Sequence, residues 1–213
     1  MSETVQFEIG TEVACRDCVC GTLARVVLDP VARAITHVIV EPKHRPGQGR
    51  LVPVDIVDAG AKELRLACSA IEFDELEYAE ETHFLSAGGE DLGYADGEVL
   101  AWPYYGAGSA AGGVPEGPRA YFSSRVPAAD VEVRRGESVH AVDGDIGRVH
   151  GLVIDPSDYQ VTHVLLAEGH LWGKKEIAIP IASVGRVDTE GVHVDLKKEE
   201  VRDLPPVPLP ERD

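Results

Sequence analysis

Methionine, aromatic side chains and positive charge are all scarce in this sequence of 213 residues. It has one methionine, 6% aromatic residues, and 20 lysines and arginines against 37 aspartates and glutamates, a formal net charge of −17. The negative charge is spread evenly, with −5 over residues 1–77, −6 over 78–130 and −6 over 131–213. Phosphate groups would repel such a chain, so we expect no nucleic-acid binding by counterion release.

Long apolar runs and catalytic motifs are also missing. No segment approaches the roughly 20 apolar residues that cross a bilayer, and the start, MSETVQFEIG, lacks the features of a secretory signal. We therefore expect a cytoplasmic protein with no transmembrane segment. GxSxG, HExxH and glycine-rich phosphate-loop motifs are absent. These absences predict a protein that is not an enzyme and needs no cofactor.

What the sequence does contain is an internal repeat. Residues 10–40 match residues 136–166 at a constant offset of 126, with ten identities in 31 positions where ordinary composition gives roughly two. The identities include two Asp-Pro pairs and two histidines: Asp29, Pro30, His37, Asp155, Pro156 and His163. The chain is therefore a tandem duplication of a unit of about 70 residues.

Each repeat has the pattern of several short strands. Valine and isoleucine dominate its apolar residues, a composition typical of strands. In the second copy, an Asp143-Gly144 turn and an Asp155-Pro156 turn separate alternating apolar segments. Five short strands in one repeat favour a small barrel, because closure removes exposed sheet edges. We predict an all-β fold of two tandem β-barrels, each with a short terminal helical turn.

The segment between the repeats differs in composition. Residues 86–120 contain nine glycines and three prolines, so we predict a Gly/Pro-rich acidic linker over residues 79–130 with much mobile chain. It joins a first barrel domain, residues 1–78, to a second, residues 131–206, and a tail follows over 207–213. The linker also holds an aromatic cluster: Trp102, Tyr104 and Tyr105. These rings either dock onto a barrel of the same chain or form a recognition segment for a partner.

The repeated pattern resembles the PRC-barrel family. It consists of Gly21/Gly147 after a hairpin, then VVLDP/LVIDP, ITHVIV/VTHVLL, a loop, and LVPVDIV/AIPIASV. This family includes the cytoplasmic domain of the photosynthetic reaction-centre H subunit and the C-terminal domain of the small-subunit ribosome maturation factor. The resemblance implies two PRC-type barrels that serve as a protein-interaction or scaffold module, with no catalytic residues. It covers about 70% of the chain and leaves out the linker.

Four cysteines offer an alternative function. Cys15, Cys18 and Cys20 form a C-x2-C-x-C run and Cys68 is a possible fourth thiolate, the number that tetrahedral zinc needs. The second copy has Ala141, Gly144, Ile146 and a position near Leu196 at the equivalent places, so the fold does not require metal there. We interpret the cysteines as free thiols in a reducing cytosol. The alternative is a ligand, metal or redox sensor that uses them or the cleft between the barrels.

Two further features of the sequence are candidate sites. His37 and His163 are flanked by apolar residues in equivalent predicted strands, so we interpret them as structural side chains, and Asp29 and Asp155 as turn residues. Leu171 and Trp172 stand in the loop EGHLWGKKE, which differs from its counterpart EPKHRPGQGR.

The Leu171–Trp172 loop either covers its own barrel or anchors a homodimer or a partner protein. We predict a scaffold whose protein partner the sequence does not identify. An RNA- or ribosome-associated role is disfavoured by charge.

Overall fold

The computed structural model describes residues 4–45, 47–58, 64–85, 99–101, 119–166, 177–188 and 190–204. The elements of the first unit are β2 (Glu12–Ala14), β3 (Val19–Asp29), β4 (Ala34–Glu41), β5 (Arg50–Pro53), η1 (Val54–Ile56), β6 (Val57–Asp58), β7 (Leu64–Leu66) and α1 (Ala70–Glu75). Those of the second unit are β12 (Ser138–Ala141), β13 (Gly144–Ile154), β14 (Val161–Leu166), β15 (Ile177–Pro180), η2 (Ile181–Ser183), β16 (Val184–Asp188), β17 (Gly191–Val194) and α2 (Lys198–Arg202). The predicted all-β class is confirmed.

The two units form equivalent sheets. Their strand orders are β5-β4-β3-β2-β7-β6 and β15-β14-β13-β12-β17-β16. The β2–β7 and β12–β17 pairs are parallel, and the other pairs within each sheet are antiparallel. Among the described residues neither sheet closes into a barrel. The two end strands of each sheet follow each other in the chain, joined by the short helix η1 or η2, but they do not pair with each other. The predicted closed barrels therefore appear as two open sheets.

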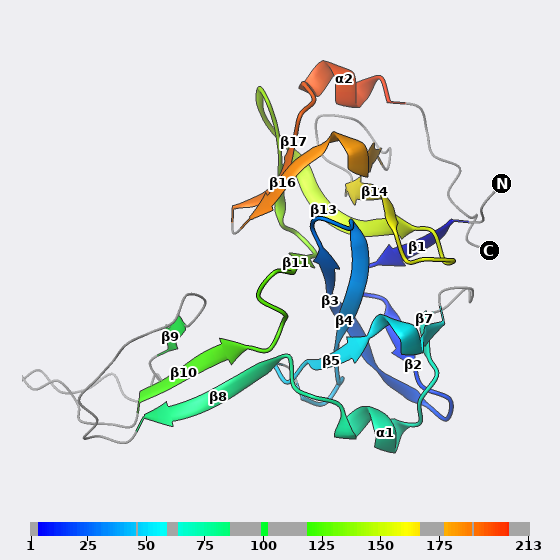
Figure 1. Ribbon diagram of the computed structural model, residues 1–213, viewed down its shortest axis with the longest axis vertical. Coiled ribbons are helices and arrows are strands. Elements are labelled where there is room, and N and C mark those ends of the chain that lie inside the picture. The colour runs from blue at the N-terminus through cyan, green and yellow to red at the C-terminus, as the bar shows by residue number, and fades with distance from the viewer. Residues whose placement is uncertain are drawn as a thin grey trace, which may run out of the picture.

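Each sheet contains a guest strand from the other unit. β1 (Val5–Glu8) precedes the first unit but pairs with β13, and β11 (Val131–Arg134) precedes the second unit but pairs with β3. Val5 lies opposite Ile154, and Val131 lies opposite Leu28, so both members of each pair are related by the offset of 126. Figure 1 shows β1 beside β13 and β11 beside β3. The units thus exchange their first strands reciprocally.

The same relation holds where the two units meet at the turns before β4 and β14. The amide of Ile35 donates to the carbonyl oxygen of Tyr159 at 3.0 Å, and the amide of Val161 donates to the carbonyl oxygen of Arg33 at 2.8 Å. Arg33 and Tyr159 both have positive φ, 54° and 57°. The repeat therefore has an approximate two-fold relation in space as well as in sequence.

One hydrophobic core joins the two units. It includes Phe7 and Val133, which are both 2% exposed, from the two guest strands, and residues of both sheets. At Gly151, a Cβ atom would lie 3.0 Å from the Cα of Glu8 and would collide with the carbonyl oxygen of Phe7. Glycine at this position therefore lets β1 approach β13.

The terminal helices begin in the same way in both units. The amide of Ala70 donates to Asp17 and that of Lys198 to Asp143, at 2.9 Å in each case. Asp17 and Asp143 are one of the identical pairs of the repeat, and each supplements the cap of a terminal helix by accepting the amide of its first residue. These helices lie at opposite ends of the body (Figure 1).

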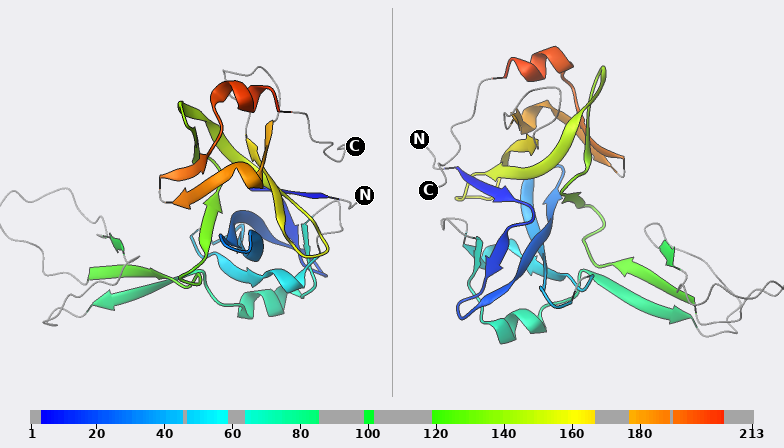
Figure 2. Two further views of the ribbon diagram at one scale, coloured as in Figure 1. Left: turned by 45° about the horizontal axis from the view of Figure 1, so that its top comes forward. Right: turned by 180° about the vertical axis from the view of Figure 1, so that it is seen from behind.

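A β-arm, which lies between the two units along the chain, projects from the body. It consists of β8 (Glu80–Leu85), β10 (Arg119–Ser124) and β9 (Val99–Ala101), with β10 in the middle. Figures 1 and 2 show β8 and β10 extending away from both sheets. Part of the predicted linker is therefore a strand pair, since Leu85 lies opposite Arg119 and Glu80 opposite Ser124.

Candidate functional sites

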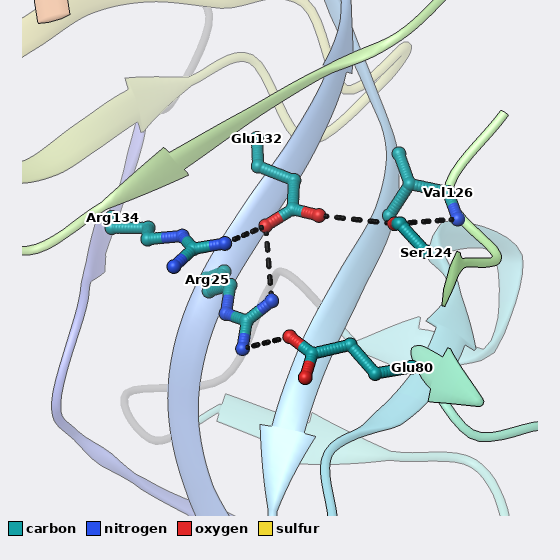
Figure 3. A network of polar contacts seen from close by, with 6 residues as sticks. All are labelled: Arg25, Glu80, Ser124, Val126, Glu132 and Arg134. Atoms are coloured by element: carbon teal, nitrogen blue, oxygen red, sulfur yellow. Dashed lines mark hydrogen bonds and ion pairs between the residues drawn. The ribbon is translucent and has the colours of Figure 1, made fainter. Parts of the chain in front are cut away.

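A polar network fixes the base of the arm, and we call it the arm junction (Figure 3). Arg25 on β3 binds Glu80 on β8 at 2.7 Å and Glu132 on β11 at 3.0 Å. Glu132 also accepts hydrogen bonds from Arg134 at 2.9 Å and from the hydroxyl of Ser124 at 3.4 Å. The arm junction therefore ties both strands of the arm to the first sheet and to its guest strand.

The arm junction belongs to the arm rather than to the repeat. The positions equivalent to Arg25 and Glu132 are Gly151 and Gln6, which cannot form this ion pair. The side chain of Arg25 is only 13% exposed, and its pKa is raised, because the hydrogen bonds and charges of Glu80 and Glu132 outweigh the opposing effect of burial. A half-buried ion network of this kind holds the arm in one direction relative to the body.

A second contact reinforces the arm just outside the strands. The guanidinium of Arg125 donates to Glu81 through Nε at 3.1 Å and Nη2 at 2.7 Å, and it lies 3.6 Å from Glu77. Val126 packs on a small apolar cluster of the first unit: Val27, Ile39, Leu51 and Ala79. The base of the arm is therefore anchored by charge on one side and by apolar packing on the other.

A pocket of about 450 Å³ lies between β11, which is in the first sheet, and β16, which is in the second. It is lined by Val131, Glu132, Arg134, Glu137, Val187 and Asp188. Oε2 of Glu137 is buried without a hydrogen-bond partner among the described residues, and burial raises the pKa of this carboxyl. This pocket is the structural counterpart of the predicted cleft between the two units.

Three of the four cysteines lie together under the first sheet. The thiol of Cys15 lies close to those of Cys20 and Cys68, and Cys20 Sγ donates to the carbonyl oxygen of Val13 at 3.2 Å. Burial raises the pKa of all three thiols. Cys18 is exposed, and all four cysteines are free. Within the described chain, the cysteine sulfurs form no group of three ligand atoms within 4.8 Å.

This arrangement predicts that one thiol per chain reacts rapidly with a thiol reagent such as DTNB. Cys18 is exposed, whereas the other three thiols are buried or partly buried and have raised pKa values, so we expect them to react roughly 100-fold more slowly. Stopped-flow absorbance would measure the phases. Cys18→Ser should remove the fast phase, and all four thiols should react in denaturant. Two or more fast thiols in the native protein would contradict this assignment.

The repeated histidines and Asp-Pro turns occupy equivalent positions. Asp29 accepts amide hydrogen bonds from Val31 and Ala32, and Asp155 accepts one from Ser157. His37 and His163 are half-buried, burial lowers the pKa of His163, and Nδ1 of His37 has no hydrogen-bond partner in the described part of the chain. Among the described residues, neither histidine is hydrogen bonded to a carboxylate, and the described chain forms no acid–base pair around them.

The predicted aromatic anchors lie outside the described residues. They are Trp102, Tyr104, Tyr105, Leu171 and Trp172.

The sequence did not indicate the arm junction, whose partners are far apart in the chain, and it gave no role to the repeated Asp17 and Asp143. The identity of that pair was the available signal for helix capping. No helix among the described residues has the length and apolar composition needed to cross a membrane.

Comparison with known proteins adds one relative. The chain matches no known protein family. It is 34% identical over 71 residues to a protein of Deinococcus radiodurans described as an uncharacterized protein. The match covers 32% of this chain and 26% of that protein, so the chain spans about a quarter of the length of the relative. The length of the match is close to that of one repeat unit.

Proposed function

We propose that this protein is a non-enzymatic interaction module built from two PRC-type barrels, with the β-arm as its recognition element. The observation that carries this proposal is the arm, which stands off the body and is anchored at its base by the arm junction. Strands paired with one another but standing clear of a folded body offer edges to a partner. The partner is a second protein, or a second copy of the chain as a homodimer.

The body fits the role of a rigid support for the arm. The strand exchange gives the two units a shared core, so a force on the arm is transmitted to both units together. A reducing cytoplasm is the compartment that suits four free thiols. The sensor alternative has less support, because thiols with raised pKa values are poor metal ligands at neutral pH.

The experiment removes the arm and keeps its base. Replacing residues 83–121 with Asn-Gly joins Thr82 to Phe122, which lie opposite each other in the β8–β10 pair, and Asn-Gly favours a tight hairpin. We expect this variant to keep the circular dichroism spectrum of the body and to lose partners captured from the source organism, or self-association seen by light scattering.

The matched control is Arg202→Ala on α2, an exposed change on the described chain far from the arm. It should capture the same partners as the natural protein. Equal capture or self-association by the arm-less variant would overturn the role of the arm. The absence of any specific partner or self-association for the natural protein would overturn the interaction function itself.

A further inference from the structure

A separate cluster of titratable side chains lies on the second unit, where β12 and β17 run parallel. His140 and His193 are register partners on these strands, and their rings stack with centroids 5.0 Å apart. Nε2 of His193 is 3.2 Å from Oδ1 of Asp188, and Nε2 of His140 is 3.2 Å from the carbonyl oxygen of Glu190. Both Nε2 atoms therefore face the turn after β16, which carries two carboxylates.

The fold itself does not require this cluster. In the first unit, the matching register positions hold Ala14, Val19 and Arg65, in place of the two histidines and Asp145. Both units form the same sheet, so the first unit shows that these strands pair without imidazole or carboxylate groups here. The cluster is therefore a property that the second unit has acquired in addition to its fold.

The spacing of the donor atoms suits a metal ion. The ligand atoms of Asp188, Glu190 and His193 all lie within 4.8 Å of one another. Around a tetrahedral zinc ion with bonds of about 2.0–2.1 Å, neighbouring ligand atoms are about 3.3 Å apart. The 3.2 Å between His193 Nε2 and Asp188 Oδ1 matches this separation. Imidazole and carboxylate ligands together suit zinc and other first-row divalent metals.

We propose that Asp188, Glu190 and His193 bind one divalent transition-metal ion, for which Zn²⁺ is the test ion. Two neighbouring groups position the ligands. The ring of His140, whose Nδ1 lies 2.6 Å from Oδ1 of Asp145, stacks on the ring of His193 and supports it. Nε of Arg186 lies 3.0 Å from Oδ2 of Asp188, which leaves Oδ1 toward His193.

Isothermal titration of the full chain with ZnCl₂ tests the site. We expect one ion per chain, no competition from excess Mg²⁺, which prefers oxygen ligands, and NMR shifts of the His140 and His193 ring protons. His193→Ala should weaken binding roughly 100-fold, and His140→Ala, which removes only the ring stacked on His193, roughly tenfold. His140→Ala introduces the residue that the first unit has at this position, Ala14, so this variant should fold.

Two controls separate this site from other ligands. His44→Ala changes an exposed histidine of the first unit, and Cys18→Ser removes the exposed thiol; both should leave Zn²⁺ affinity unchanged. The proposal is overturned if the natural protein shows no saturable Zn²⁺ binding at neutral pH. It is equally overturned if affinity is unchanged in folded His193→Ala, or is lost in Cys18→Ser.

Discussion

Phe7→Ala is expected to loosen the second sheet, although Phe7 stands near the start of the first unit. Phe7 lies opposite Leu152 on β13 and is 2% exposed in the shared core. Removing a buried phenylalanine ring leaves a cavity and lowers the free energy of unfolding by about 3–5 kcal/mol. Because β1 pairs with β13 in the second sheet, we expect the largest increase in amide hydrogen exchange in β13 and β14.

Val133→Ala is the matched variant, since Val133 occupies the position of Phe7 in the repeat and is also 2% exposed. It should cost about 2 kcal/mol, because fewer buried carbon atoms are removed than from phenylalanine, and should raise exchange in β3 and β4. Urea unfolding would measure the free energies, and hydrogen-exchange mass spectrometry would locate the changes. If each variant loosened the sheet of its own repeat, the strand exchange would be contradicted.

Strand exchange explains how the arm can separate the two units along the chain while the units share one core. The chain leaves the first unit through β8, returns through β10, and then adds β11 to the first sheet before it builds the second. β11 therefore follows the arm directly and packs beside Arg25 of the arm junction. A change in the direction of the arm would move a guest strand, so arm and body are mechanically coupled.

Much of the local structure could be predicted from the sequence. The repeat at an offset of 126 places β3 and β4 over β13 and β14, and the Asp-Pro pairs mark turns that Asp29 and Asp155 do stabilise. Local signals of this kind succeed because turn residues and alternating valines act on neighbouring backbone. The all-β class follows from them directly.

The strand exchange could not be predicted in this way. The sequences VQFE and VEVR have the same alternation, so either could pair with β3 or β13 on periodicity alone. The choice depends on side chains that are distant in the chain, such as Gly151, which admits the backbone of β1. Alternation identifies a strand, but the partner of that strand is decided by non-local packing.

The candidate sites illustrate the same limit. The glycine-rich composition of residues 86–120 suggested a mobile linker, but the flanking segments form β8 and β10. In the arm junction, Arg25 and Glu132 are 107 residues apart in the chain, and no motif connects them. The cysteines were recognised because three of them are close in sequence, whereas His140 and His193 meet only through the parallel pairing of β12 and β17.

Arg25→Met is expected to lower the free energy of unfolding by about 3 kcal/mol and to release the arm. The change keeps the apolar stem of the side chain and removes the charge, which leaves Glu132, 17% exposed, without its cation from β3. Removing one partner of a largely buried ion pair is costly because the remaining charge stays desolvated. Exchange should increase in β8, β10 and β11, the three strands that the arm junction joins to β3.

A double-mutant cycle with Glu132→Gln tests whether this loss comes from the pair. If the loss arises because the Glu132 carboxylate no longer has Arg25 as its partner, Arg25→Met combined with Glu132→Gln should recover about 1–2 kcal/mol relative to Arg25→Met alone. Arg202→Met is the control, because its pair with Asp203 is exposed on both sides, and such surface pairs contribute less than about 1 kcal/mol. Equal, small losses for Arg25→Met and Arg202→Met would show that the arm is held by apolar packing around Val126 and not by the arm junction.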